Sequence, residues 1–315
     1  MPFPPSTNKK SKPAPLWDSV KELYRDFDLQ SFRAIGGVND RLGVWGAKHN
    51  SSRYYKSLMF EFSMYLNNLL FNKGIDDVRD ITATLNKIKN QNLGSPPTIR
   101  LDETDVSLDY LWGLEEYIFC LDTLSEVDSV CEIGAGFGRT CHTFLSLTDI
   151  ASYTIVDLPE ILALSKAYLS EVLDKKEYEK IRFVSADDYA SVQEFDLAIN
   201  INSLQEMPNL VGRAYLEFIS MRSQFFFTKN ALGKYSPSDI DLEITNTNEY
   251  ESAMEMGLIT DKFKLFDINR REEAVKIYHE IYCPNGFTLL KTQRGFGQHL
   301  SYELSLFHKY SGRQI

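Results

Sequence analysis

The chain has 315 residues, of which 43% are hydrophobic and 25% charged, and its formal net charge is −10; this composition is ordinary for a soluble globular protein of about two domains. The acidic balance argues against a nucleic-acid partner, because phosphate contacts need clustered Lys and Arg. No apolar run approaches the roughly 20 residues of a membrane-spanning helix, so we expect no membrane partner.

The first 15 residues are rich in Pro and Lys and lack the apolar core of a secretory signal. We predict a disordered tail over residues 1–15. The four cysteines (Cys120, Cys131, Cys141 and Cys283) show no CxxC spacing, which favours neither a zinc site nor a disulfide framework. A reducing cytoplasm is the simplest location that fits.

Residues 16–125 are predicted to form a helical N-terminal cap domain. Apolar residues recur at helical spacing in three segments, 57–71, 78–88 and 108–124. Loops are expected at two places, residues 49–52 and 94–97. The many aromatic side chains of the last helix are predicted to pack in a core. This cap should close over a ligand and offer a surface for a homodimer.

From residue 126 onward strand-like and helix-like segments alternate, which predicts a doubly wound, parallel α/β sheet. Strands are expected at residues 129–133, 153–156, 181–184, 195–200 and 224–228. Helices are expected at residues 140–147, 159–169 and 207–219. Residues 231–268 then form a long acidic insertion, and a helix follows over 269–282. Two last strands, 287–292 and 300–309, are predicted to form a closing hairpin.

The first predicted strand of this half ends in a turn with three alternating glycines. Glycines at this point let a nucleotide-like ligand approach the backbone at the start of a helix. A dinucleotide fingerprint, GxGxxG, would need a third glycine where Arg139 stands, and no P-loop pattern is present. These two facts argue against a dehydrogenase and against a nucleotide triphosphatase.

The pattern Glu132-x-Gly134-x-Gly136-x-Gly138 closely resembles the first motif of the class I methyltransferases that use S-adenosylmethionine. The resemblance implies a mostly parallel, seven-stranded Rossmann-like methyltransferase sheet over residues 126–315. It implies S-adenosylmethionine as cofactor, S-adenosylhomocysteine as product, and donor contacts from all four of these residues. A structural alternative is that Glu132 only caps the turn.

Further polar residues follow the next strands, at the edge of an open α/β sheet where ligands bind. Asp157 ends the second strand, where a carboxylate can accept both ribose hydroxyl protons, and Leu158 adjoins it. Asp187 and Asp188 follow the third strand, where this fold usually meets the adenine. Asn200 and Asn202 end the fourth strand, beside the methyl donor.

Each of these residues also has a structural interpretation. Asp157 can be an ordinary surface residue before a helix that begins at a proline, and the pair Asp187 and Asp188 can belong to a loop. Arg139 is expected to be a surface residue of the first helical turn rather than a clamp for the substrate.

Two longer segments narrow the resemblance. Residues 153–169, which include Asp157, and residues 200–208, which include Asn202, look like the corresponding segments of a bacterial sugar O-methyltransferase family. The resemblance covers residues 131–208 well. It implies methyl transfer to a hydroxyl of a sugar, of a sugar-containing natural product or of a polysaccharide precursor.

An alcohol is a weak acid, so methyl transfer to it needs a general base or a metal ion. Glu206 follows the fourth strand and is one candidate base; the other is His299, near the closing hairpin. Each has a structural alternative: Glu206 can be a structural partner at the start of the following helix, and His299 can be a surface side chain. His49 is a weaker candidate, His142 is expected to pack or face solvent, and His279 and His308 are expected to be structural.

No Asp, Glu or His cluster has an evident metal spacing, although carboxylates on separate loops leave room for a divalent metal ion. The insertion is expected to cover the acceptor, and four polar residues are candidates for binding sugar hydroxyls: Lys229, Asn230, Tyr235 and Asn248. Two alternatives for function stay open. One is an O-methyltransferase of a phenol or carboxylate, and the other is a non-catalytic protein that binds the donor.

Overall fold

The computed structural model describes residues 24, 26–35, 47–49, 51–72, 78–234, 242–262, 268–295 and 301–310. The predicted tail over residues 1–15 and the candidates Tyr235 and His299 lie outside the described residues, as does the side chain of His49.

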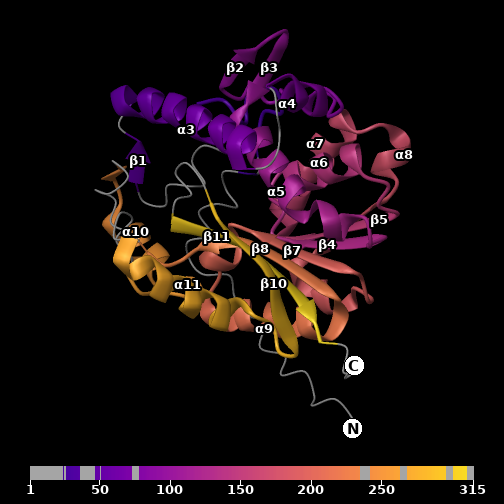
Figure 1. Cartoon of the computed structure of the whole chain (residues 1–315), viewed down its shortest axis with the longest axis vertical. Helices are drawn as coiled ribbons and strands as arrows, with labels where there is room; N and C mark the ends of the chain where they lie inside the picture. Colours follow the sequence, from indigo (N-terminus) through magenta and orange to yellow (C-terminus); the bar gives the residue numbers. More distant parts are fainter. Residues whose placement is uncertain are drawn as a thin grey trace.

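Helices and strands alternate through the C-terminal two thirds of the chain, as Figure 1 shows. The elements are, in order, β1 (Ala47–His49), α3 (Ser51–Asn72), α4 (Val78–Leu85), β2 (Thr98–Leu101), β3 (Thr104–Ser107), α5 (Leu108–Leu124), β4 (Ser129–Ile133), α6 (Arg139–Leu147), β5 (Ser152–Asp157), α7 (Pro159–Val172), α8 (Lys175–Tyr178), β6 (Ile181–Ser185), η1 (Ala186–Ser191), β7 (Leu197–Ile201), η2 (Leu204–Glu206), α9 (Asn209–Arg222), β8 (Phe225–Ala231), β9 (Leu242–Ile244), α10 (Thr247–Met254), α11 (Ile268–Tyr282), β10 (Phe287–Arg294) and β11 (Tyr302–Lys309).

Seven strands form one sheet in the order β10-β11-β8-β7-β4-β5-β6. The five strands from β4 to β8 are parallel, and β11 and β10 add an antiparallel hairpin at one edge. The predicted fold class, a doubly wound and mostly parallel seven-stranded Rossmann-like sheet, is therefore confirmed, including the closing hairpin. The carboxyl ends of all five parallel strands meet at one edge of this sheet.

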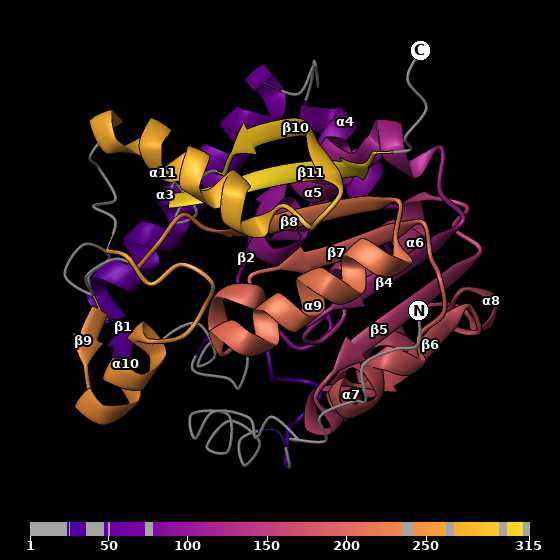
Figure 2. The ribbon, with the colours of Figure 1, turned by 90° about the horizontal axis from the view of Figure 1, so that it is seen from below.

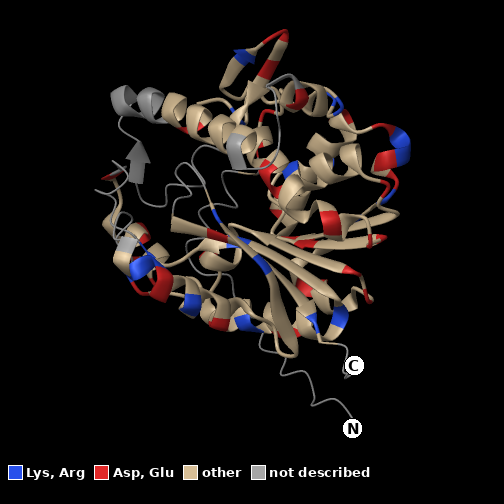
Figure 3. Ribbon diagram, in the orientation of Figure 1, with Lys and Arg blue, Asp and Glu red and all other residues tan. Residues whose placement is uncertain are grey.

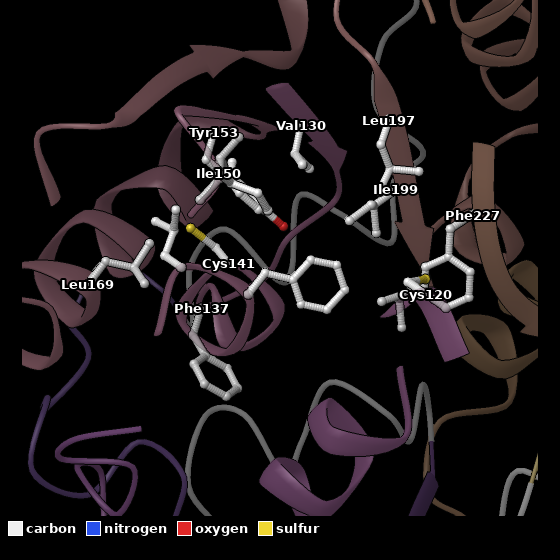
Figure 4. Packing of buried hydrophobic residues seen from close by; sticks show 14 of the residues in the cluster. Cys120, Val130, Phe137, Cys141, Ile150, Tyr153, Leu169, Leu197, Ile199 and Phe227 are labelled. Atoms are coloured by element: carbon white, nitrogen blue, oxygen red, sulfur yellow. The ribbon is translucent and has the colours of Figure 1, made fainter. Parts of the chain in front are cut away.

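Both faces of the sheet are buried, because successive side chains of each strand point to opposite sides. On one face Val130 and Tyr153 pack against α5, α6 and α7 (Figure 4). On the other face the next residue of β4, Cys131, packs against α9 and α11 together with Phe226 and Phe307. This two-sided burial explains why the strands read as nearly continuous apolar runs in the sequence.

The described N-terminal region contains the helices α3, α4 and α5, the hairpin β2–β3 and the short strand β1. A separate core joins α3, α4 and α5, and its buried aromatic residues include Phe62, Tyr65 and Tyr110. The prediction that the aromatics of α5 serve core packing is confirmed, since Phe119 also packs under the sheet against Phe227. Because α5 contributes to both cores, the division of the chain at residues 125 and 126 stays a prediction.

Two local predictions for this region are wrong. Residues 98–107, between the predicted helices, form the antiparallel hairpin β2–β3, which turns at Asp102 with a positive φ of 48°. Its strands are only four residues long, so any alternation of polar and apolar residues is too short to indicate a strand. The predicted loop at residues 49–52 is instead the end of β1 and the start of α3.

The insertion contains its own elements, β9 and α10, and β9 pairs with β1 of the N-terminal region. Figure 2 shows β1, β9 and α10 together beside the end of α3. The segment after α10 packs on the sheet domain, because Leu258 is buried and lies against Gly212 of α9. The insertion thus joins the N-terminal region to the carboxyl edge of the sheet.

Acidic and basic residues are interspersed along the outer helices α8 and α11 (Figure 3). Within the described part of the chain, no helix is both long enough and apolar enough to cross a membrane.

Candidate functional site

The glycine turn between β4 and α6 combines positive φ angles with close contacts. Gly134, Gly136 and Gly138 have φ angles of 75°, 58° and 96°, which favour glycine. A Cβ on Gly134 would lie 1.9 Å from Oγ of Ser203, and one on Gly138 would lie 2.7 Å from a methyl group of Leu169. A Cβ on Gly136 would meet no atom within 4 Å. Two glycines are therefore required by packing, whereas Gly136 borders open space.

Asp157 lies across from this turn at the end of β5. Its Oδ2 accepts a hydrogen bond of 3.0 Å from the backbone N–H of Gly136, and its Oδ1 accepts one of 2.8 Å from the N–H of Leu158. Burial by the surrounding protein raises the pKa of Asp157 to about 7, although these two N–H groups act to lower it. The carboxylate of Asp157 is thus attached to the turn at Gly136, the glycine of the turn whose Cβ direction is open.

Glu132 is buried beneath the turn rather than at its surface, with an exposed fraction of 2%. Its Oε2 accepts a hydrogen bond of 2.7 Å from the hydroxyl of Tyr153. Burial raises the pKa of Glu132 to about 7, while the Tyr153 hydrogen bond and the charge of Arg139 oppose this shift. This carboxyl supports the turn from below, and its predicted contact with the donor stays a prediction.

Asn200 links the glycine turn to the neighbouring loop. Its Nδ2 donates to the carbonyl of Ile133 at 2.8 Å, and its Oδ1 accepts from the N–H of Leu204 at 3.1 Å and from Nδ2 of Asn230 at 2.9 Å. Asn200 and Asn230 are both fully buried. These internal partners make Asn200 a residue that positions the turn; its predicted donor contact is untested.

Asn202 behaves differently, because it follows β7 with a positive φ of 57°. Its side-chain oxygen is buried and has no hydrogen-bond partner among the described residues. A buried acceptor of this kind suits an N–H donor on a ligand. Asn202 follows β7, Gly136 follows β4 and Asp157 ends β5, so all three lie at the carboxyl edge of the sheet.

Asp187 and Asp188 lie in η1, directly after β6, and both are exposed. Leu158 caps α7 and packs partly buried against the apolar core. All three therefore lie next to Asp157 at the carboxyl edge, where the predicted adenine contacts would be made. Their contacts with a donor stay predictions.

Arg139 is not a surface residue, contrary to the prediction, since its exposed fraction is 9%. Its guanidinium forms an ion pair of 2.6 Å with Glu116 of α5, and Glu116 also accepts from Nζ of Lys229 at 3.1 Å. Lys229 reaches Glu115 as well, at 3.0 Å. Burial acts to raise the pKa of Glu116, but the charges of Arg139 and Lys229 hold it below its usual value.

These contacts also correct the expectation that Lys229 and Asn230 are available to sugar hydroxyls. Both side chains are fully buried and bound to internal partners, the carboxylates of α5 and the amide of Asn200 respectively. Asn248, by contrast, is exposed on α10. The side chains nearest an acceptor must therefore come from other positions.

Glu206, which is predicted to be the general base, is half-buried at the end of η2. Two residues that the sequence did not indicate lie near its charge. Tyr24 is buried, and its pKa is raised by burial and by the charges of Asp157 and Glu206. Lys234 has a pKa that burial lowers and that the charge of Glu206 raises. Tyr24 is thus close to the carboxylates of both Asp157 and Glu206.

The segment that follows Tyr24 is fixed by Arg33. This buried guanidinium pairs with Asp109 of α5 at 2.7 Å and donates to Oγ of Ser107 at 3.1 Å. It also lies over the rings of Tyr110 and Phe137. No local pattern in the sequence indicates these contacts, since Arg33 and Asp109 are separated by 76 positions.

The described histidine side chains do not gather at this edge. His142 is buried, its Nδ1 lies 2.5 Å from the hydroxyl of Tyr110, and burial together with Arg33 lowers its pKa to about 3. His279 contacts Thr292 and Ser305 at 3.1 Å each. Among the described residues, no group of three or more Asp, Glu, His or Cys side chains is arranged to hold a metal ion.

Comparisons with known proteins complete the description of the site. No family model and no curated protein matches the chain. Among solved structures, the chain is similar to LaPhzM (12% identity, TM-score 0.40), over 64% of this chain and 58% of that protein. It is also similar to an O-methyltransferase family protein from Burkholderia thailandensis (10% identity, TM-score 0.42), over 65% of this chain and 60% of that protein. A third similar structure is human N-acetylserotonin methyltransferase in complex with SAM (17% identity, TM-score 0.40), over 78% of this chain and 70% of that protein.

Proposed function

We propose that the chain is an O-methyltransferase that uses S-adenosylmethionine to methylate a hydroxyl of a sugar, a sugar-containing natural product or a polysaccharide precursor. The observation that carries the proposal is the arrangement of Asp157 with the glycine turn. The carboxylate accepts from the N–H of Gly136 at 3.0 Å, and Gly136 is the glycine of this turn whose Cβ direction is open. A ribose diol bound there would donate to this carboxylate.

Three described parts of the chain would hold the donor. Asp157 would bind the ribose, the open side of Gly136 would face the amino-acid moiety, and the buried oxygen of Asn202 would accept from its amino group. When bound, the donor supplies a methyl group attached to a sulfonium sulfur. The exposed pair Asp187 and Asp188 would border the adenine.

The protein's part in the chemistry is to place the acceptor hydroxyl and to take its proton. The acceptor oxygen must lie about 3 Å from the methyl carbon, in line with the bond that breaks. A bound donor would supply the methyl group and its sulfur would take up the electron pair of the broken bond, while the hydroxyl proton would go to a base on the protein. Glu206 is our candidate for this base, because it lies half-buried at the same strand edge; His299 is the second candidate.

Sugar as the acceptor class is supported by the family-like segments 153–169 and 200–208, and by the carboxylate of Glu206 at this edge, our candidate base. A phenol ionises more easily and needs such a base less. The insertion, which packs on α9 and pairs with β1, would form one wall of the acceptor site.

One experiment tests the proposal directly. The protein is incubated with S-adenosylmethionine that carries an isotopic methyl label and with separate panels of sugar nucleotides, glycans and phenols. We expect label in at least one saccharide. Label in phenols alone would refute the sugar assignment, and tight donor binding without transfer to any panel would favour the non-catalytic alternative.

A further inference from the structure

Gln205, the residue before Glu206, is held at all four of its polar groups. Its backbone N–H donates to Oδ1 of Asn230 at 3.3 Å, and its carbonyl accepts from Nζ of Lys234 at 3.2 Å. Its side-chain oxygen accepts from the N–H of Ala231 at 2.7 Å, and its side-chain nitrogen donates to the hydroxyl of Tyr302 at 2.8 Å. These four hydrogen bonds attach the backbone and the side chain of Gln205 to β8, to β11 and to Lys234.

Lys234 lies near the start of the insertion and connects this turn to later residues of the insertion. Besides Gln205, its ammonium donates to the carbonyl of Ala253 at the end of α10, at 3.1 Å. Its backbone N–H donates to the carbonyl of Asp261 at 2.8 Å. One residue therefore connects the turn that carries Glu206 to two distant points of the insertion.

The insertion approaches the same turn so closely that no side chain fits between them. The N–H of Gly257 donates to the carbonyl of Met207 at 2.7 Å. A Cβ on Gly257 would lie 2.8 Å from the carbonyl oxygen of Gln205, and its φ of 95° also favours glycine. The backbone on both sides of Glu206 is thus in direct contact with the insertion.

Charge reinforces these contacts. Burial lowers the pKa of Lys234, whereas the nearby carboxylate of Glu206 acts to raise it. The ammonium of Lys234 and the carboxylate of Glu206 therefore attract each other in a partly desolvated place, where charge-assisted contacts are strong.

We propose that Gln205 and Lys234 are positioning residues for methyl transfer, because together they fix the turn that carries Glu206 against the sheet and against the insertion. The inference rests on the proposed function, since it assigns Glu206 a task in the reaction. It also identifies the insertion as a fixed wall of the acceptor side. Gln205 and Lys234 act through Glu206 and do not need to touch the acceptor.

The test compares two variants with matched controls in the full-length protein. Gln205→Met and Lys234→Met keep the side-chain length and remove the hydrogen bonds. Gln193→Met and Lys276→Met make the same changes at exposed side chains. The measurements are kcat and KM for the acceptor that the labelling experiment identifies, the dissociation constant of S-adenosylhomocysteine by calorimetry, and backbone hydrogen exchange of the folded proteins.

We expect the two test variants to lose about 10- to 100-fold in kcat, because a displacement of about 1 Å of a reacting group has this effect. Donor affinity should stay unchanged, since the glycine turn and Asp157 are intact. Amides of the turn and of Gly257 should exchange faster than in the wild type. Both controls should match the wild type, and Lys234→Arg should recover part of the kcat.

Two results would overturn the proposal. Unchanged exchange in both test variants would show that these residues do not hold the turn. Faster exchange with an unchanged kcat would show that holding the turn does not serve the reaction. If the wild-type protein transfers no methyl group to any acceptor, the proposed function fails, and with it the positioning role; the exchange data still decide whether the attachment of the turn exists.

Discussion

Replacing Glu116 with glutamine should destabilise the protein strongly, because this carboxylate joins two buried cations. Glu116 and Lys229 have side chains with 0% exposure, and the Arg139 side chain is 11% exposed. With Glu115, the four charges sum to zero (two negative and two positive). Glu116→Gln leaves a net charge of +1 in the same volume.

The expected loss follows from the burial of this cluster. Removing one partner of a buried ion pair costs about 3–5 kcal/mol. Glutamine can still accept one hydrogen bond from Arg139, so we expect the lower end, about 3 kcal/mol, in the free energy of unfolding. For a domain of this size about 1 kcal/mol corresponds to about 2–4 °C in Tm, which predicts a fall of about 6–12 °C by calorimetry or circular dichroism.

A matched control is Glu103→Gln. Glu103 pairs with Arg100 at 3.0 Å, but its side chain is 97% exposed, so its substitution should change stability by less than about 0.5 kcal/mol. Chemical denaturation of the three proteins gives the comparison. If the Glu116→Gln variant were as stable as this control, the buried cluster would not contribute through its charges.

The sign of the pH dependence gives a second check on Glu116. Its pKa in the folded protein lies below the usual 4.5, so its contribution to stability is fully present above pH 4.5. The contribution is lost as the pH falls through the lowered pKa. The difference in unfolding free energy between the wild type and Glu116→Gln should therefore shrink on acidification. A difference that grew at low pH would contradict the assignment.

Two further predictions concern the donor side. Gly134→Ala should lower the free energy of unfolding by about 2 kcal/mol or more, because its Cβ would collide with Ser203. Gly136→Ala should lower it by only about 1–2 kcal/mol, because of its positive φ, and should weaken the binding of S-adenosylhomocysteine. Equal stability losses and equal affinities in the two variants would contradict this prediction. Because burial raises the pKa of Asp157 to about 7, S-adenosylhomocysteine should bind more tightly as the pH rises from about 6 to about 8, and Asp157→Asn should flatten that part of the profile. The raised pKa also means that Asp157 contributes to stability below 3.8 and loses that contribution as the pH rises through about 7; a wild-type binding profile without slope would refute the role of its ionised form.

The sheet could be predicted from the sequence because its signals are local. The run that ends at Ile133 and the glycines after it indicate a strand and a turn, and the observed β4 has the predicted bounds. Pro159 begins α7 as predicted, since a missing N–H costs nothing at a first helical position. The hairpin β2–β3 was not indicated, because its strands are only four residues long and too short for a clear periodic signal.

The site was predictable only where its residues directly follow predicted strands of the parallel sheet. Asp157 and the glycine turn are brought together by the parallel sheet, as expected. The burial of Arg139 was not predicted, because its partner Glu116 lies on a helix that the local pattern assigned to a separate cap. Tyr24 and Lys234 were missed for the same reason: their proximity to Glu206 arises from tertiary contacts between distant segments.

The pairing of β1 with β9 has a consequence for biosynthesis. Ala47 faces Ile244, so the two partners are separated by 197 positions (244 minus 47). At a synthesis rate of about 5–20 residues per second, β1 leaves the ribosome about 10–40 s before its partner exists. An open strand edge is a site of unwanted pairing during such an interval. Nascent chains stalled before residue 242 should therefore depend more on chaperones than chains stalled after it.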